Sequence, residues 1–371
     1  MAKGLLSGAL IVILLIGLLP FAAVKAASFD SYLADLQSDD WKTRRDAVLA
    51  LGGFTDDAPA VASILQAMLD DADRNVRWAA VQSLIQLGGE SSTAVLCDAV
   101  NHPQEDVRKE AMKALGKLGQ AAESAVPVLI GVLRSNDALK VEAMSALGSI
   151  GSGAQAAIPE LALLLGDEFR VSMAAKQALA KIDPNADVLE ILAAAAQSND
   201  LTTAVRAAKA LGGMSAQASN VVPVLIEQLQ SPEPEVVAAA VTALGSMGKA
   251  GHQAIPTLVA LIGSNVPNVR IAVVNTLGTM KAEEELVIPN LAKALEDANA
   301  DVVKAVLKAL RSYGTKAAAA APQVALVLAW NDEVVRRMAN ETLAAVDPGF
   351  DAGAALAAML RGDDASVGIK A

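Results

Sequence analysis

The chain has 371 residues, of which 53% are hydrophobic and only 3% aromatic, and its formal net charge is −11. This acidic balance argues against a general affinity for nucleic acid or anionic lipid, because both need a positively charged surface. The single cysteine, Cys97, excludes an internal disulfide framework and a cysteine-based metal cluster.

Residues 1–26 have the pattern of a secretory signal peptide. Lys3 gives a positive start, an apolar run follows to Leu19, and "AVKA" ends at Ala26 with the small residues of a cleavage site. We therefore expect an exported protein, periplasmic or extracellular, whose mature chain begins at Ala27. The alternative is a retained membrane anchor, because Leu5–Val24 is just long enough to span a bilayer.

A repeat of 31–33 residues governs the chain from there to residue 346. "AMSALGSIG" at 143–151 and "AVTALGSMG" at 240–248 are nearly the same sequence. The leucine of this motif recurs as Leu51, Leu84, Leu115, Leu147, Leu179, Leu211, Leu244, Leu277, Leu310 and Leu343, which we take as position 0 of repeats 1 to 10. So regular a period indicates stacked helical units and not one globular core.

Each leucine lies on a helix, here called the second helix of its repeat. Apolar or small residues at offsets −8, −4, −1, 0 and +3 share one helical face. Offset −1 is Ala, Ser or Thr in every repeat, which predicts a close approach between neighbouring helices. Glycines four residues after the leucine predict the helix end; they are Gly88, Gly119, Gly151, Gly248 and Gly314.

A first helix precedes the second one in each repeat. Prolines recur 20 or 21 residues before the leucine, where they suit the first turn of a helix; they are Pro127, Pro159, Pro223, Pro256, Pro289 and Pro322. The chain is thus predicted to be all-α, a right-handed α-solenoid of about ten helix pairs over residues 27–346. Residues 347–371 are predicted to form a capping helix and a tail.

Three of these second helices resemble those of a known family. "NVRWAAVQSL" (75–84), "DVRKEAMKALGKLG" (106–119) and "NVRIAVVNTLG" (268–278) are similar to HEAT repeats of the short, armadillo-like kind found in bacterial proteins and phycobiliprotein lyases. The resemblance implies a ladder of arginines at offset −7 and second helices that line a concave surface. Ser172, Ala204 and Val237 replace the arginine, so we expect an interrupted ladder.

No residue pattern predicts a catalytic, cofactor or metal site. His102 and His252 are far apart and are interpreted as loop residues, and Cys97 lies among apolar residues with no histidine near it in sequence. The acidic pairs, such as residues 39–40 and 70–71, are interpreted as solvated turns. We expect no enzyme activity and no cofactor.

Charge is distributed unevenly over the repeats. The second helices, taken from −9 to +2, hold twenty of the thirty basic residues and seven of the forty-one acidic ones. Offsets −6 and −2 lie one turn apart on their outward side. The residues predicted there to bind a partner are Arg45, Trp78, Lys109, Lys113, Val141, Met173, Val205, Lys209, Ile271, Lys304, Lys308 and Arg337.

These residues favour a non-enzymatic scaffold of the cell envelope that holds a protein or peptide in a concave groove. Lysines toward both ends and apolar residues between them predict a partner with acidic ends and an apolar middle. The alternatives are burial of the apolar stripe by neighbouring helices, a binder of polyanions or nucleic acid, and a lyase-like HEAT enzyme.

Overall fold

The computed structural model describes residues 29–135 and 138–361, and it contains helices and turns but no strand within these ranges. The all-helical prediction is therefore confirmed. The predicted signal segment lies outside the described residues. None of the described helices combines the length and the hydropathy that a membrane span requires.

The described helices alternate as predicted. The second helices are α3 (Trp41–Leu51), α5 (Arg74–Leu87), α7 (Glu105–Leu118), α9 (Lys140–Ile150), α11 (Phe169–Ile182), α13 (Leu201–Gly212), α15 (Pro234–Ser246), α17 (Pro267–Met280), α19 (Ala300–Tyr313) and α21 (Glu333–Val346). The first helices are α2 (Phe29–Asp35), α4 (Ala58–Ala67), α6 (Gly89–Ala99), α8 (Val126–Arg134), α10 (Ile158–Leu163), α12 (Val188–Ala196), α14 (Ala218–Gln228), α16 (Ile255–Leu261), α18 (Glu284–Lys293) and α20 (Ala321–Leu326).

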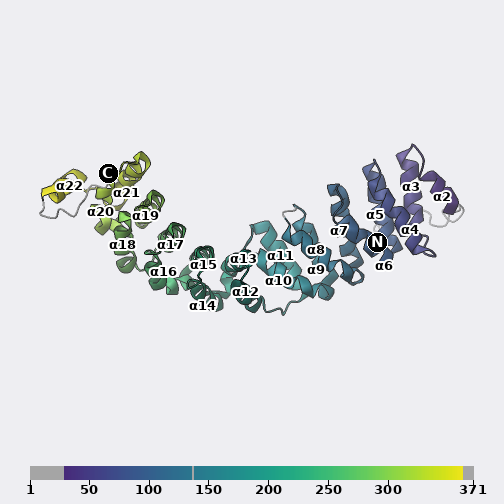
Figure 1. The fold of residues 1–371 in the computed structure, drawn as a ribbon, viewed down its shortest axis with the longest axis horizontal. Helices are drawn as coiled ribbons and strands as arrows, with labels where there is room; N and C mark the ends of the chain where they lie inside the picture. Colours follow the sequence, from purple (N-terminus) through teal and green to yellow (C-terminus); the bar gives the residue numbers. More distant parts are fainter. Residues whose placement is uncertain (1–28, 136–137, 362–371) are drawn as a thin grey trace, which may run out of the picture. The chain divides into compact units, whose positions relative to one another are not determined.

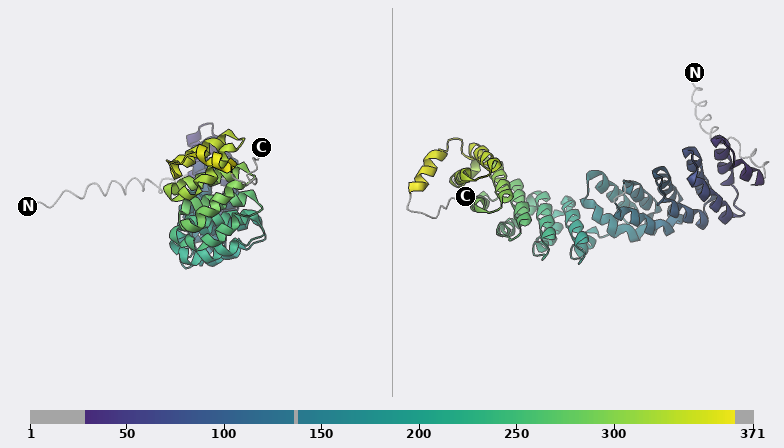
Figure 2. Two further views of the ribbon diagram at one scale, coloured as in Figure 1. Left: turned by 90° about the vertical axis from the view of Figure 1, so that its left-hand side faces the viewer. Right: turned by 45° about the horizontal axis from the view of Figure 1, so that its top comes forward.

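The helices form two compact units. Unit 1 contains the described residues up to Glu160 together with Gln177–Asn185, and unit 2 contains Leu161–Lys176 and the described residues from Ala186 on. The division therefore passes through α11. Within each unit the second helices pack in chain order, α3 to α9 in unit 1 and α13 to α21 in unit 2 (Figures 1 and 2).

The repeated leucines form the core of both units. All ten are buried, and Leu211, Leu244 and Leu277 have no exposed surface. Burying a leucine side chain stabilises a fold by about 1.5–3 kcal/mol. Because each repeat contributes one such leucine, the core extends from repeat to repeat.

The "ALG" motif is explained by contact between neighbouring second helices. A Cβ atom added to Gly278 would lie 2.9 Å from the Cα atom of Ala309, which is at offset −1 of the next repeat. Glycine after the leucine and a small residue at −1 therefore meet across the interface. Where the −1 residue carries a hydroxyl, the hydroxyl donates to the preceding second helix: Ser83 Oγ lies 2.8 Å from the Val48 carbonyl oxygen.

The predicted helix ends are confirmed, and the predicted helix starts are correct only in part. The five glycines four residues after the leucine have φ between 56° and 71°, in the left-handed region that favours glycine. Pro127 and Pro256 lie in the first turn of α8 and α16 as expected. Pro223 and Pro289 instead lie inside α14 and α18, because these helices begin about one turn earlier.

A further helix, α22 (Ala352–Arg361), lies within the segment predicted to cap the stack. It packs against α20, the first helix of repeat 10.

Candidate protein-binding grooves

The arginines at offset −7 have a structural role. The Nε atom of Arg44 lies 2.7 Å from a carboxylate oxygen of Asp71, in the turn before the next second helix, and Nη1 donates to the Ser38 carbonyl oxygen. Arg77 and Arg270 repeat this arrangement. The side-chain hydrogen bond from Arg44 lowers the pKa of Asp71. These arginines therefore join successive repeats, as the resemblance implied, and are not available to a partner.

The ladder is interrupted in repeats 5 to 7, as predicted, and also in repeat 9, where the buried Val303 stands at offset −7. In repeat 5, Ser172 Oγ donates to the Leu165 carbonyl oxygen at 2.8 Å, which satisfies the same turn without reaching the next repeat. Ala204 and Val237, at the equivalent positions, are buried. The cross-repeat arginine contact is thus replaced by local packing in these three repeats.

The stacking of α13 also departs from that of its neighbours. Ala243 and Ala309, at offset −1 of their helices, pack against the glycine after the leucine of the preceding second helix. Ala210 holds the same offset in α13, but the glycine that it meets is Gly166. This glycine ends the short 3₁₀ helix Leu164–Gly166, which precedes α11. A Cβ atom added to Gly166 would lie 2.6 Å from the Ala210 nitrogen. The segment before α11 therefore takes the place of a second helix in this contact.

A groove of about 900 Å³ lies in unit 2 beside this contact. It is lined by residues of α11, α13, α15 and the start of α17, and we call it the unit 2 groove. Met173, Val205 and Lys209, three of the predicted partner-binding residues, all line it. Met173 is 38% exposed and Val205 is half-buried, so neighbouring helices cover this part of the stripe only in part.

Sequence patterns missed several residues of the unit 2 groove. Phe169, the first residue of α11, is 82% exposed and lines the groove one turn before Met173. The side chains of Lys176 and Glu235 line it too, as does that of Asn268. A signal for Phe169 existed: it is one of only five phenylalanines, and it stands at a helix start that is polar in several other repeats. Lys176 lies at offset −3, and Glu235 and Asn268 lie at offset −9; no feature of the repeat singles out these offsets.

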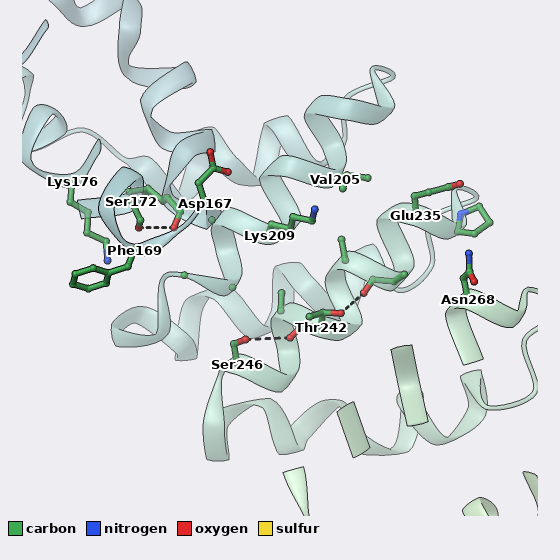
Figure 3. Close-up of a pocket in the computed structure, with 18 of the residues that line it drawn as sticks. Asp167, Phe169, Ser172, Lys176, Val205, Lys209, Glu235, Thr242, Ser246 and Asn268 are labelled. Atoms are coloured by element: carbon green, nitrogen blue, oxygen red, sulfur yellow. Dashed lines mark hydrogen bonds between the residues drawn. The ribbon is translucent and has the colours of Figure 1, made fainter. Parts of the chain in front are cut away.

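The charges of the unit 2 groove are separated along it. Phe169 and Lys176 lie at one side in Figure 3, Glu235 and Asn268 lie at the other, and Lys209 lies between them. Asp167 lines the groove on the side of the lysines. Within the described part of the chain, neither Lys176 nor Lys209 forms an ion pair, and neither does Glu235. These charges are therefore available to a bound molecule.

A second hollow, of about 630 Å³, lies in unit 1, and we call it the unit 1 cleft. It brings together Trp78, Lys109 and Lys113 of the predicted set. Trp78 is 46% exposed. The lysines, however, already contact carboxylates: Lys109 Nζ lies 3.5 Å from Glu142, and Lys113 Nζ lies 2.6 Å from Glu110.

The other predicted partner-binding residues line neither hollow. Arg45 pairs with Asp46 at 2.7 Å and lies over the Trp41 ring. Lys304 contacts Asp301 and Asp332 at 3.3 and 3.6 Å, and the hydrogen bond to Asp301 raises the pKa of Lys304. The remaining four are at least partly exposed; they are Val141, Ile271, Lys308 and Arg337. Lys109, Lys113 and Lys304 thus already contact carboxylates one turn away or on the next repeat, and an acidic partner would compete with these carboxylates.

The structure also gives the surroundings of His102, Cys97 and two of the paired acidic residues. His102 Nε2 lies 3.0 Å from Asp70, and its Nδ1 accepts a hydrogen bond from the Gln104 amide. Cys97 is half-buried, and burial raises the pKa of its thiol, which disfavours the reactive thiolate. Asp40 and Asp57, from the acidic pairs, cap the starts of α3 and α4. No group of three or more potential metal ligands gathers among the described residues.

Comparison with known proteins relates this architecture to others. The family model of HEAT repeats matches residues 30–116, 61–144, 189–266, 222–311 and 264–344. The structure is similar to that of the karyopherin Kap121p (TM-score 0.54, 14% identity, 91% of this chain and 44% of that chain). It is also similar to Kap121p bound to the extreme C-terminus of the protein phosphatase Cdc14p (0.53, 14%, 86% and 41%).

A weaker likeness links the chain to the complex of CpcE and CpcF of phycocyanin lyase from Nostoc (TM-score 0.34, 24% identity, 62% of this chain and 93% of that chain). No match was found among curated proteins. The chain spans less than half the length of the karyopherin, so that likeness concerns the fold.

Proposed function

This chain belongs to the HEAT-repeat family, and from its unit 2 groove we propose that it is a non-enzymatic scaffold that binds a segment of another protein. The observation that carries the proposal is the exposure of Phe169 and Met173 in a groove built by successive second helices. Large apolar side chains exposed together in a hollow with charged margins are typical of interaction surfaces.

The chemistry of the groove suits the binding of a protein segment. Its lysines and carboxylates flank apolar side chains, an arrangement that orients a bound segment. A polyanion binder is less well supported, because three of the predicted lysines are already paired with carboxylates.

We further propose that the protein is exported and acts in the cell envelope, on the basis of residues 1–26. The proposed partner keeps the predicted apolar middle and acidic ends; its ends would have to compete with the carboxylates that hold Lys109 and Lys304. N-terminal sequencing of the cellular protein tests the export proposal. A chain that begins at Ala27 supports it, and one that begins at Met1 in the membrane fraction favours the anchor.

The binding proposal is tested by the double substitution Met173→Asp and Val205→Asp. The altered chain should lose partners that the unaltered chain retains from an envelope extract, while its far-UV circular dichroism and its unfolding midpoint stay unchanged. The matched control is Leu286→Asp with Val334→Asp, two residues of unit 2 with 37% and 43% exposure that lie outside the groove. If both double variants retained the same partners in the same amounts, the proposal that the unit 2 groove binds them would be wrong.

A further inference from the structure

The unit 2 groove differs from a simple apolar trough because its opposite ends carry opposite charge. Lys176 of α11 and Lys209 of α13 lie on the side of the groove away from Glu235, with Lys209 the nearer of the two to Glu235 and Asp167 as the one carboxylate beside them. Glu235 stands at the end formed by the start of α15. The first end is therefore net positive and the second negative, although the N-terminus of α15 offsets about half of the Glu235 charge.

The register of the helices sets the separation of these charges. Gly212 of α13 is level with Ala243 of α15, since a Cβ atom on the glycine would lie 2.9 Å from the Ala243 Cβ atom. Glu235 then lies five residues along the axis from the level of Lys209, which is about 7.5 Å at 1.5 Å per residue. With neighbouring helices about 9 Å apart, the backbone separation is about 12 Å.

An extended chain covers this separation in three to four residues, at about 3.3 Å per residue. We infer that the groove selects an extended segment with an acidic and a basic residue three or four positions apart, in either order. The acidic residue faces Lys209 and Lys176, and the basic residue faces Glu235. Apolar side chains next to the acidic residue contact Phe169, Met173 and Val205. This inference rests on the proposed function and names the partner segment by its charge order.

Length and position favour a segment from within a protein chain and not a free end. The groove crosses α11, α13, α15 and the start of α17, so a bound chain can enter at one side and leave at the other. The acidic residue of the segment faces unpaired lysines, and its basic residue faces the unpaired Glu235. An entirely acidic segment would instead place a negative charge next to Glu235.

The test is selection of a random peptide library on the full chain and on its Glu235→Lys variant. Peptides enriched on the unaltered chain should combine an apolar cluster with an acidic and a basic residue three or four positions apart. On Glu235→Lys the basic residue should be replaced by an acidic one, and peptides selected on the unaltered chain should bind the variant about threefold to tenfold more weakly. The matched control is Glu190→Lys, an exposed first-turn glutamate of α12 outside the groove, which should leave the selected charges unchanged.

The outcomes separate the two proposals. Enriched peptides that lose binding with Met173→Asp and Val205→Asp, but show no charge order and no response to Glu235→Lys, overturn the inference and leave the scaffold proposal intact. Absence of enrichment, or enriched peptides indifferent to the double substitution, overturns both. Enrichment with the expected charge order, reversed at one end by Glu235→Lys, supports both.

Discussion

Replacing Gly278 by alanine measures how closely the second helices approach one another. The new Cβ atom would lie 2.9 Å from both the Cα and the Cβ atoms of Ala309, and neither atom can rotate away. Overpacking of this kind costs about 1–3 kcal/mol. Alanine also restricts the unfolded chain, which stabilises the folded state by about 0.4–1 kcal/mol. The expected net loss of stability is about 1–2 kcal/mol.

Gly131→Ala is the matched control, because Gly131 lies inside α8 and a Cβ atom there would meet nothing within 4 Å. Only the unfolded-state effect then remains, so this variant should gain about 0.4–1 kcal/mol.

Native-state hydrogen exchange suits a repeat protein because it reports local opening in each repeat. Exchange in α17 and α19 should become about five- to thirtyfold faster in Gly278→Ala, and exchange in α8 about two- to fivefold slower in Gly131→Ala. Unchanged or slower exchange in Gly278→Ala would refute the close approach.

Three further predictions follow from burial and charge. Leu244→Ala should cost about 2–5 kcal/mol in the free energy of unfolding, and so should Leu211→Ala, because both side chains are fully buried; a cost below half a kcal/mol by urea denaturation would contradict the assigned core face. Arg270→Ala should cost about 2–3 kcal/mol because it removes two charge-assisted hydrogen bonds from a mostly buried carboxylate. Arg311→Ala, which breaks an exposed pair, should cost less than about 1 kcal/mol, and equal losses would contradict the structural role of the ladder. Burial raises the pKa of Tyr313 to about 12, so stability is fully present below about pH 10 and declines as the pH rises toward 12; a decline of the same size in Tyr313→Phe would show that this phenol is not its cause.

The fold could be predicted from the sequence because it depends on local periodicity. The spacing of the leucines and the apolar offsets fix which face of each second helix is buried, and the terminal glycines fix where several helices stop. The starts of α14 and α18 could not be predicted in the same way. Other repeats have a 3₁₀ helix ahead of the proline, such as Gly248–Ala254 before Pro256, whereas α14 and α18 are already α-helical there.

The candidate site was predictable only in part, for two physical reasons. Offsets −6 and −2 correctly place Met173, Val205 and Lys209 on the outward side of their helices, because that side follows from helix geometry. Whether a lysine on that side is free depends on the next repeat, and the carboxylate of Glu142 next to Lys109 is an example. A column of equivalent residues carries no information on such contacts.

The unit 2 groove lies next to irregularities of the repeat. The unit 2 groove lies where the regularity of the repeats fails, whereas the unit 1 cleft lies between α5 and α7, where the ladder arginine Arg77 is present. Ala210 packs against Gly166, in the 3₁₀ helix that precedes α11, and this contact lies beside the groove. The same repeats lack the ladder arginine, with Ser172 and Val237 in its place. For the unit 2 groove, departures from the repeat therefore mark the candidate site, whereas the repeated offsets report which residues stack.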